Sequence, residues 1–137
     1  MRAKIVSFDR QNEESLMVVD FNINNSTLLL AFDTGATHTV IDMTALLLMN
    51  IPIPKNAEIG LLETAKGIIE APVIEIAECH FGGISRKNFK IHSYDYIANG
   101  VLADIDGVLG LDFFQDYKFC IDTLNFEISI IKAIKRS

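Results

Sequence analysis

Hydrophobic residues near the start of the chain follow the pattern of two consecutive β-strands. Leu16–Ile23 is rich in β-forming residues that partly alternate with polar ones, which predicts a strand. Asn24-Asn25 follows, and asparagine tolerates the left-handed backbone conformation that tight hairpin turns need. Thr27–Phe32 then contains a continuous apolar run typical of a buried strand, which ends abruptly at Asp33-Thr34-Gly35.

The next segment predicts the best helix of the chain. Asp42–Met49 begins with a residue that can cap a helix, and its later residues are strong helix formers. Asn50 and the prolines Pro52 and Pro54 stop it. Because this helix is apolar nearly all round, we expect it to be largely buried or shared with a partner.

Further short strands and turns fill the rest of the chain. The pattern predicts strands at Ile59–Glu63, Ile68–Ala77, Phe89–Ser93, Tyr117–Asp122 and Phe126–Ile131, turns at Thr64–Gly67, Gly82-Gly83, Asn99-Gly100 and Thr123–Asn125, and one helical turn at Asp112–Asp116. Closely spaced strands with one good helix predict a mainly β fold. No linker or low-complexity stretch divides the chain, so we expect a single domain over residues 1–137.

The composition narrows the class of protein. Half of the 137 residues are hydrophobic, which is enough for a core and argues against disorder. The net charge of −6, from 12 Lys and Arg against 18 Asp and Glu, argues against binding to nucleic acid or to anionic membranes. No apolar run approaches the roughly 20 residues that span a bilayer, and no apolar secretion signal is visible. We therefore expect a soluble, cytoplasmic protein.

Cysteine and histidine residues do not predict a disulfide framework or a metal site. Cys79 and Cys120 are predicted to be reduced, buried strand residues, and neither lies in a context typical of a nucleophile. His38, His80 and His92 lack the spacing of a zinc site, and His38 is expected to pack or to face solvent. We expect no metal and no cofactor.

The most informative segment surrounds Asp33. This residue directly follows five apolar strand residues, where an acidic side chain is unfavourable unless something solvates or pairs it. Gly35 allows a sharp turn that brings backbone amides close to the carboxylate, and Thr34 adds a hydroxyl. The segment therefore either holds a functional carboxylate in a fixed orientation or is an Asx turn, in which Asp33 bonds to the amide of Gly35 or Ala36.

The surroundings of Asp33 resemble a known active site. Asp33-Thr34-Gly35-Ala36-Thr37, between Leu30-Ala31-Phe32 and Val40-Ile41, is similar to the active-site signature of aspartic proteases. Some 73 residues downstream, Asp106–Phe114 resembles the second signature of the retropepsin-like group, in which a glycine-containing element crosses the loop that holds the catalytic aspartate. The resemblance covers roughly Leu16–Ile131 and implies a closed, barrel-like β fold with one short-to-medium helix.

The same resemblance implies a homodimeric aspartic endopeptidase that acts on peptides or proteins. Members with one Asp-Thr-Gly motif per chain pair so that each subunit donates one aspartate. Hydrolysis by this route needs two carboxylates that share a proton, because one activates water while the other protonates the carbonyl oxygen. The pair titrates as a unit, so we expect a bell-shaped pH profile of activity on the acidic side.

Individual roles follow from the resemblance. Asp33 would be catalytic, Thr34 would bond across the subunit interface, and Gly35 would support the carboxylate. Ala36 and Thr37 would line the floor of the cleft. Thr64, Ala65, Lys66 and Gly67 would form a flap that binds the substrate from above. Val108, Leu109 and Gly110 would support the site. The terminal segments Ile5–Phe8 and Ile128–Ile134 could pair between subunits.

Two other classes of function stay open. A chain with this fold can lose hydrolysis and serve as a catalytically silent peptide-binding or dimerisation module. Alternatively, the tripeptide arises by chance in a structural domain, and Asp106–Phe114 then has no reason to lie near Asp33. Asp104 and Asp106 are expected to be loop carboxylates and not rival catalytic groups, since neither follows a buried strand.

Overall fold

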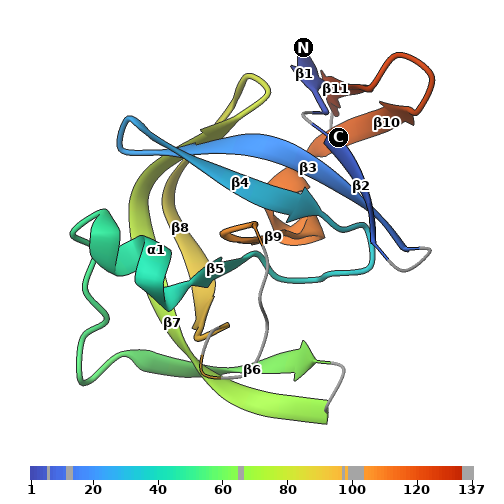
Figure 1. Cartoon of the computed structure of the whole chain (residues 1–137). Helices are drawn as coiled ribbons and strands as arrows, with labels where there is room; N and C mark the ends of the chain where they lie inside the picture. Colours follow the sequence, from blue (N-terminus) through green and yellow to red (C-terminus); the bar gives the residue numbers. More distant parts are fainter. Residues whose placement is uncertain (6, 12–13, 65–66, 97, 99–103, 134–137) are drawn as a thin grey trace.

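The computed structural model describes residues 1–5, 7–11, 14–64, 67–96, 98 and 104–133 (Figure 1). The strands are β1 (Arg2–Lys4), β2 (Ser7–Gln11), β3 (Glu14–Ile23), β4 (Ser26–Phe32), β5 (Val40–Asp42), β6 (Glu58–Thr64), β7 (Gly67–Phe81), β8 (Ile84–Tyr94), β9 (Gly107–Leu109), β10 (Tyr117–Asp122) and β11 (Glu127–Lys132). The helices are α1 (Met43–Leu48) and one turn of 3-10 helix, η1 (Leu111–Phe114). The predicted mainly β fold with one short helix is confirmed.

Six strands close into a barrel. The larger sheet has the order β2-β3-β4-β9-β5-β8-β7-β6. β3 also pairs with β7, and this pairing closes the strands from β3 to β7 into a ring. The resulting ring is β3-β4-β9-β5-β8-β7, in which the short strand β9 lies between β4 and β5 (Figure 1). Phe113 is fully buried in the core and contacts Phe21, Phe81 and Phe89 edge to face.

Two hairpins form where the sequence predicts them. Asn24 and Asn25 have φ values of 47° and 69°, and they connect β3 to β4 with Ile23 opposite Ser26. Gly82 and Gly83 have φ values of 56° and 89° and connect β7 to β8 in the same way. Positive φ at both central residues matches the right-handed twist of the flanking strands, which is why asparagine and glycine stand there.

The helix α1 is shorter and less buried than predicted. Its side-chain cap is missing, because the Asp42 carboxylate instead accepts a hydrogen bond from the backbone N–H of Tyr96 at 3.4 Å. Asn50 ends the helix with a φ of 60°. Ala45 and Leu46 are buried, whereas Leu47 and Leu48 are 60% and 81% exposed. Within this chain only one face of the helix contributes to the core, so α1 is not largely buried, and the alternative that it is shared with a partner stays a prediction.

The strands β7 and β8 extend well beyond the predicted segments. β7 has 15 residues and β8 has 11, because charged residues that interrupt the apolar pattern lie opposite one another on an exposed face. Glu75 pairs with Lys90 and Glu78 pairs with Lys87 across the two strands. Opposite charges on directly facing residues stabilise an antiparallel pair, so polar positions here continue the strands.

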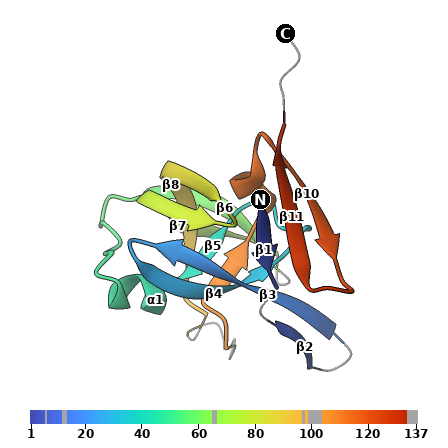
Figure 2. The same ribbon diagram turned by 90° about the horizontal axis from the view of Figure 1, so that it is seen from above.

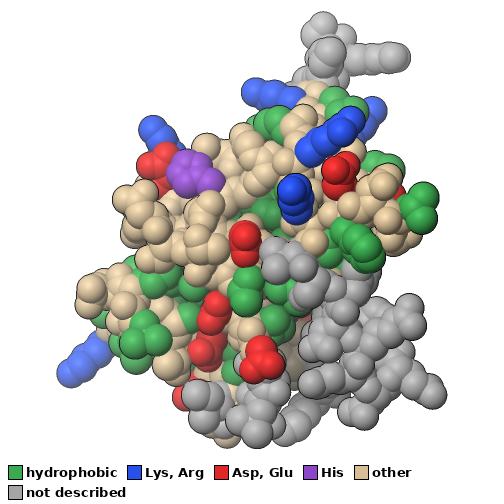
Figure 3. Space-filling view, turned by 45° about the horizontal axis from the view of Figure 1, so that its top comes forward, with side chains coloured by type: hydrophobic (Ala, Val, Ile, Leu, Met, Phe, Trp, Pro, Cys, Tyr) green, Lys and Arg blue, Asp and Glu red, His purple; other side chains and the backbone are tan. Residues whose placement is uncertain are grey.

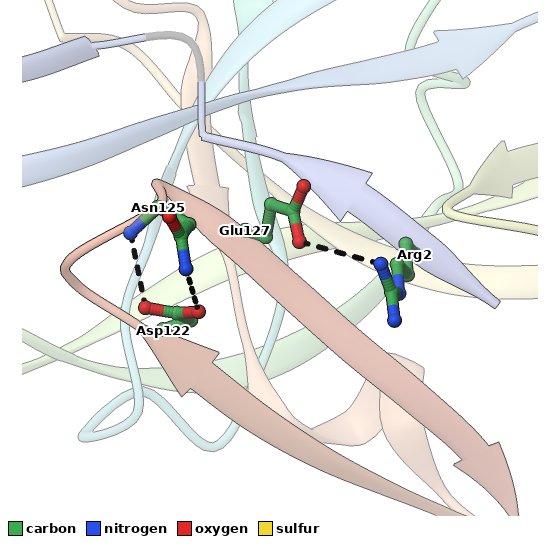
Figure 4. A network of polar contacts seen from close by, with 4 residues as sticks. All are labelled: Arg2, Asp122, Asn125 and Glu127. Carbon is green, nitrogen blue, oxygen red and sulfur yellow. Dashed lines mark hydrogen bonds and ion pairs between the residues drawn. The ribbon is translucent and has the colours of Figure 1, made fainter.

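The chain termini form a separate three-stranded sheet, β1-β11-β10 (Figure 2). Ala3 lies opposite Ile128, and Arg2 forms a 3.9 Å ion pair with Glu127 (Figure 4). β11 therefore has a strand on each side within its own chain, so its residues 128–129 have no free edge for the expected pairing between subunits. The expected pairing of Ile5–Phe8 and of residues 130–134 between subunits stays a prediction. Ile134 lies outside the described residues.

The β10–β11 turn confirms the predicted turn at Thr123–Asn125. Asp122 accepts hydrogen bonds from the backbone N–H of Asn125 at 3.0 Å and from Asn125 Nδ2 at 2.8 Å (Figure 4). It also accepts one from the backbone N–H of Leu124 at 3.0 Å. The bonds from Asn125 hold the pKa of the Asp122 carboxyl below its usual value. The strand β11 begins at Glu127 and not at Phe126, because Phe126 has a φ of 55°.

Charge is unevenly distributed over the surface. The exposed residues Arg2, Lys4, Lys118 and Lys132 all belong to the terminal sheet. Figure 3 shows the corresponding gathering of Lys and Arg side chains at one end of the molecule, with Asp and Glu side chains toward its middle. None of the helices in the described ranges is long and apolar enough to cross a membrane.

Candidate active site

Asp33 lies at the end of β4, where the chain leaves the barrel. Phe32 before it is buried, whereas Asp33 itself is exposed. Its Oδ1 atom accepts a hydrogen bond from the Gly35 N–H at 2.8 Å, and its backbone carbonyl accepts one from Ala36 N–H at 3.1 Å. The turn is thus an Asx turn that also gives the carboxylate a fixed orientation, so the two interpretations of this segment are compatible.

The strand β9 holds this turn in place through backbone hydrogen bonds. β9 lies between β4 and β5, with Phe32 opposite Leu109 and Val40 opposite Val108. Asp33 N–H donates to the carbonyl of Leu109 at 3.2 Å, and Leu111 N–H donates to the carbonyl of Ala36 at 2.9 Å. The two sequence signatures therefore meet in space, which contradicts the hypothesis of a chance tripeptide.

A buried polar network behind the turn was not predicted. Thr39 is fully buried, and both its N–H and its Oγ1 donate to the Asp112 carboxylate, at 3.0 and 2.8 Å. The same Oγ1 accepts a hydrogen bond from Gly110 N–H at 3.1 Å. A Cβ atom on Gly110 would lie 2.6 Å from the carbonyl carbon of His38, so glycine permits this close approach. The network ties η1 to the loop that follows Asp33.

The other predicted residues of the Asp33 segment lie at or near the surface. Thr34, Gly35 and Thr37 are exposed, and Ala36 is half-buried. The role of Thr34 in a subunit interface stays a prediction, as does that of Ala36 and Thr37 in substrate binding.

The predicted flap is the hairpin of β6 and β7, at the bottom of Figure 1. Thr64 lies opposite Gly67 and donates a hydrogen bond from its hydroxyl to the Gly67 carbonyl at 2.8 Å, while Gly67 has a φ of 114°. Ala65 and Lys66 lie outside the described residues. Leu62 and Ala71 pack against Val40, the first residue of β5, so the hairpin contacts the strand that follows the Asp33 loop.

Comparison with known proteins agrees with this geometry. The family model described as aspartyl protease matches residues 19–113, which include Asp33, the hairpin and β9. The chain belongs to the aspartyl protease family. The crystal structure of a retropepsin-like aspartic protease from Rickettsia conorii is similar in fold, with a TM-score of 0.60 and 21% identity over 97% of this chain and 89% of that one. No curated protein matches the chain.

Rival carboxylates in the chain have other surroundings. Asp106 Oδ2 accepts a hydrogen bond from Leu29 N–H at 2.9 Å, and the Asp106 carbonyl accepts one from Asp42 N–H at 2.8 Å. These bonds connect the start of β9 to β4 and β5, as expected of a structural loop residue. Asp104 is exposed and precedes β9. Asp33 is thus the carboxylate that lies at the strand end held by both signatures.

The three histidines lie in two places. His80 bonds to Ser85 at 2.7 Å near the β7–β8 turn, whereas the His38 and His92 rings lie 4.5 Å apart behind the Asp33 turn. His38 is exposed and packs on His92, which agrees with the prediction. Among the residues that the structure describes, no three His, Cys, Asp or Glu side chains are grouped as a metal site requires.

The two cysteines are both free, but only one is buried. Cys79 is fully buried in β7, and burial raises the pKa of its thiol to about 12. Cys120 is exposed, so the prediction that both are buried is wrong for this residue. In β10 Cys120 alternates with Phe119 and Ile121, which pack against the core, and this places it on the outer face of the terminal sheet.

We expect the two thiols to react at very different rates. A disulfide exchange reagent at pH 8 should modify Cys120 within minutes and Cys79 only after denaturation, because the thiolate is the reactive form and Cys79 is both buried and protonated. The measurement is thiol release with and without denaturant, and Cys120→Ser is the control that should leave no fast phase. Two fast equivalents from the native protein would contradict the burial of Cys79.

Proposed function

We propose that the chain is an aspartic endopeptidase that works as a homodimer, with one Asp33 from each subunit in a shared catalytic pair. The main support is the Asp33 carboxylate, which is exposed at the end of a buried strand and oriented by the Gly35 amide. Such placement leaves the side chain accessible to a partner and to water. Membership of the aspartyl protease family supports the same chemistry.

The proposed reaction is general acid–base hydrolysis without a cofactor. One Asp33 carboxylate would take a proton from water while the other, protonated, would donate to the carbonyl oxygen of the peptide. Because Asp106 is used in backbone bonding, a second copy of Asp33 is the source of the partner carboxylate that we favour. A twofold axis would place the two identical turns opposite one another, with Thr34 beside them.

The hairpin of β6 and β7 would complete the cleft. Strands that close over an extended substrate can add main-chain hydrogen bonds and exclude water from the reacting groups. The packing of Leu62 and Ala71 against Val40 supports this, because movement of the hairpin would then change its contact with β5, the strand that follows the Asp33 loop. The substrate that we propose is an extended segment of a peptide or an unfolded protein.

Specific activity is expected to fall on dilution if the site is shared between subunits. The assay is cleavage of an unfolded protein from acid to neutral pH over a wide range of enzyme concentration, with sedimentation velocity to measure the dimer fraction. Activity per chain should follow the dimer fraction, because a single subunit supplies one carboxylate. Constant activity per chain in samples that sediment as monomers would contradict the proposal. A folded dimer that binds peptides and cuts none would favour the catalytically silent module.

A further inference from the structure

His92 lies between the loop that follows Asp33 and the hairpin strand β6. Its side chain is only 8% exposed, and its backbone N–H donates to the Thr39 carbonyl at 3.0 Å. On one side its ring packs against the His38 ring at a centroid distance of 4.5 Å. On the other side lies Gly60, where a Cβ atom would come within 2.7 Å of His92 Nε2. The imidazole therefore contacts two segments that the proposed reaction needs.

The surroundings of this ring favour its neutral form. Burial lowers the pKa of His92, and the neighbouring His38 lowers it further. Three groups raise the pKa of His92, but the result is still a lowered pKa. They are the Asp112 carboxylate from η1, a hydrogen bond with the Leu61 backbone, and the Glu58 carboxylate from β6. Asp112 is also the acceptor for both donors of Thr39, so the carboxylate that faces His92 is already bonded to the loop.

We propose that His92 is a positioning residue for the catalytic turn, whose neutral ring fixes the His38–Thr39 segment against β6 and whose protonation at acidic pH loosens both segments together. This inference rests on the proposed function and adds its regulation. A positive charge on the His92 ring is disfavoured by its burial and by the neighbouring His38, and Gly60 leaves no space on the other side for the ring to move away. Loosening of the loop would misplace Asp33 in the shared pair.

The consequence is a second acid limit on activity, in addition to the one that protonation of both aspartates imposes. A carboxylate pair that shares a proton works on the acidic side, whereas His92 holds the turn in place only while it is neutral. Since the pKa of His92 is lower in the folded state, the unfolded state takes up a proton first as the pH falls below about 6.5. The folded state should therefore lose stability from about that pH downward.

The test that does not depend on activity is a titration of the Asp33→Asn protein followed by NMR. This background removes the titration of Asp33 itself and any self-cleavage. We expect the amide signals of Gly35 and Gly60 to shift with the same midpoint as the His92 ring, and the additional change His92→Gln to abolish that shift. If the Gly60 amide follows His92 and the Gly35 amide does not, the ring does not position the turn and the inference is wrong.

The second test of this inference is the pH profile of activity. His92→Gln, which cannot titrate, should move the acid limb of the normalised kcat/KM profile to lower pH by about one unit, while the exposed-site control His80→Gln should leave the limb in place. Gly60→Ala, which pushes on the ring, should reduce kcat/KM by roughly tenfold or more. Identical acid limbs in wild type and His92→Gln would overturn the inference. Absence of cleavage by every form would instead overturn the proposed function, and the NMR titration would still decide the role of His92.

Discussion

Asp33→Asn is expected to reduce peptide cleavage by at least about a thousandfold without unfolding the protein, because general acid–base catalysis contributes about 10²–10⁴ and both carboxylates of the pair would be lost. Asparagine keeps the size of the side chain, and its carbonyl oxygen can still accept the 2.8 Å hydrogen bond from Gly35 N–H. The turn and its bonds to β9 involve backbone atoms of Asp33, which the substitution leaves intact.

The measurement is cleavage of an unfolded protein by wild type and Asp33→Asn at matched dimer concentration, with circular dichroism to show that both are folded. Asp104→Asn is the matched control, because Asp104 is exposed close to the second signature and should not affect the reaction. Retention of wild-type activity by Asp33→Asn would rule out the shared aspartate pair.

Mixing the two forms sharpens this test. If subunits exchange at random, about one quarter of the dimers in an equal mixture of wild type and Asp33→Asn have Asp33 in both subunits. The mixture should therefore show about one quarter of the activity of wild type at the same total protein concentration. Retention of one half would mean that each subunit acts alone. The experiment separates a shared site from a site completed within one chain.

The position of Asp33 could be predicted because its determinants are local. A run of apolar residues, an acidic residue and a glycine two positions later define a strand end and a tight turn without information from the rest of the chain. The Asn24-Asn25 turn was predictable for the same reason, because a positive φ at two adjacent positions selects for asparagine or glycine.

The groups behind the turn could not be predicted in this way. Thr39 and Asp112 are 73 residues apart, and they meet because β9 inserts between β4 and β5. His92 comes from β8 and reaches the same place through its pairing with Val40. In the sequence these residues look like ordinary polar positions, since their burial depends on strand order and not on local pattern. The strand order of a barrel is fixed by long-range pairing, which the periodicity of one segment does not encode.

Gly107→Ala is expected to produce the largest loss of stability among the glycine substitutions, because it affects the insertion of β9. A Cβ atom at this position would lie 2.0 Å from the Val40 carbonyl oxygen and 3.0 Å from Ile41 Cα. These are backbone atoms of β5 and cannot rotate away. Gly107 also has a φ of 155°, which L residues rarely adopt. Overpacking costs typically 1–3 kcal/mol where side chains can adjust, so we expect a loss of at least about 3 kcal/mol here.

Gly67→Ala provides the matched control for this prediction. Gly67 also has a positive φ, of 114°, but nothing lies within 4 Å of the added Cβ, so only the backbone strain of about 1–2 kcal/mol should appear. The measurement is the urea midpoint of unfolding at constant slope for wild type and both variants. Since single domains are stable by about 5–15 kcal/mol, Gly107→Ala is expected to lose a large share of its stability and to unfold at a clearly lower urea concentration than Gly67→Ala. Equal losses for the two variants would mean that β9 can move away from β5, and the close approach of the two signatures would then not be what holds Asp33 in place.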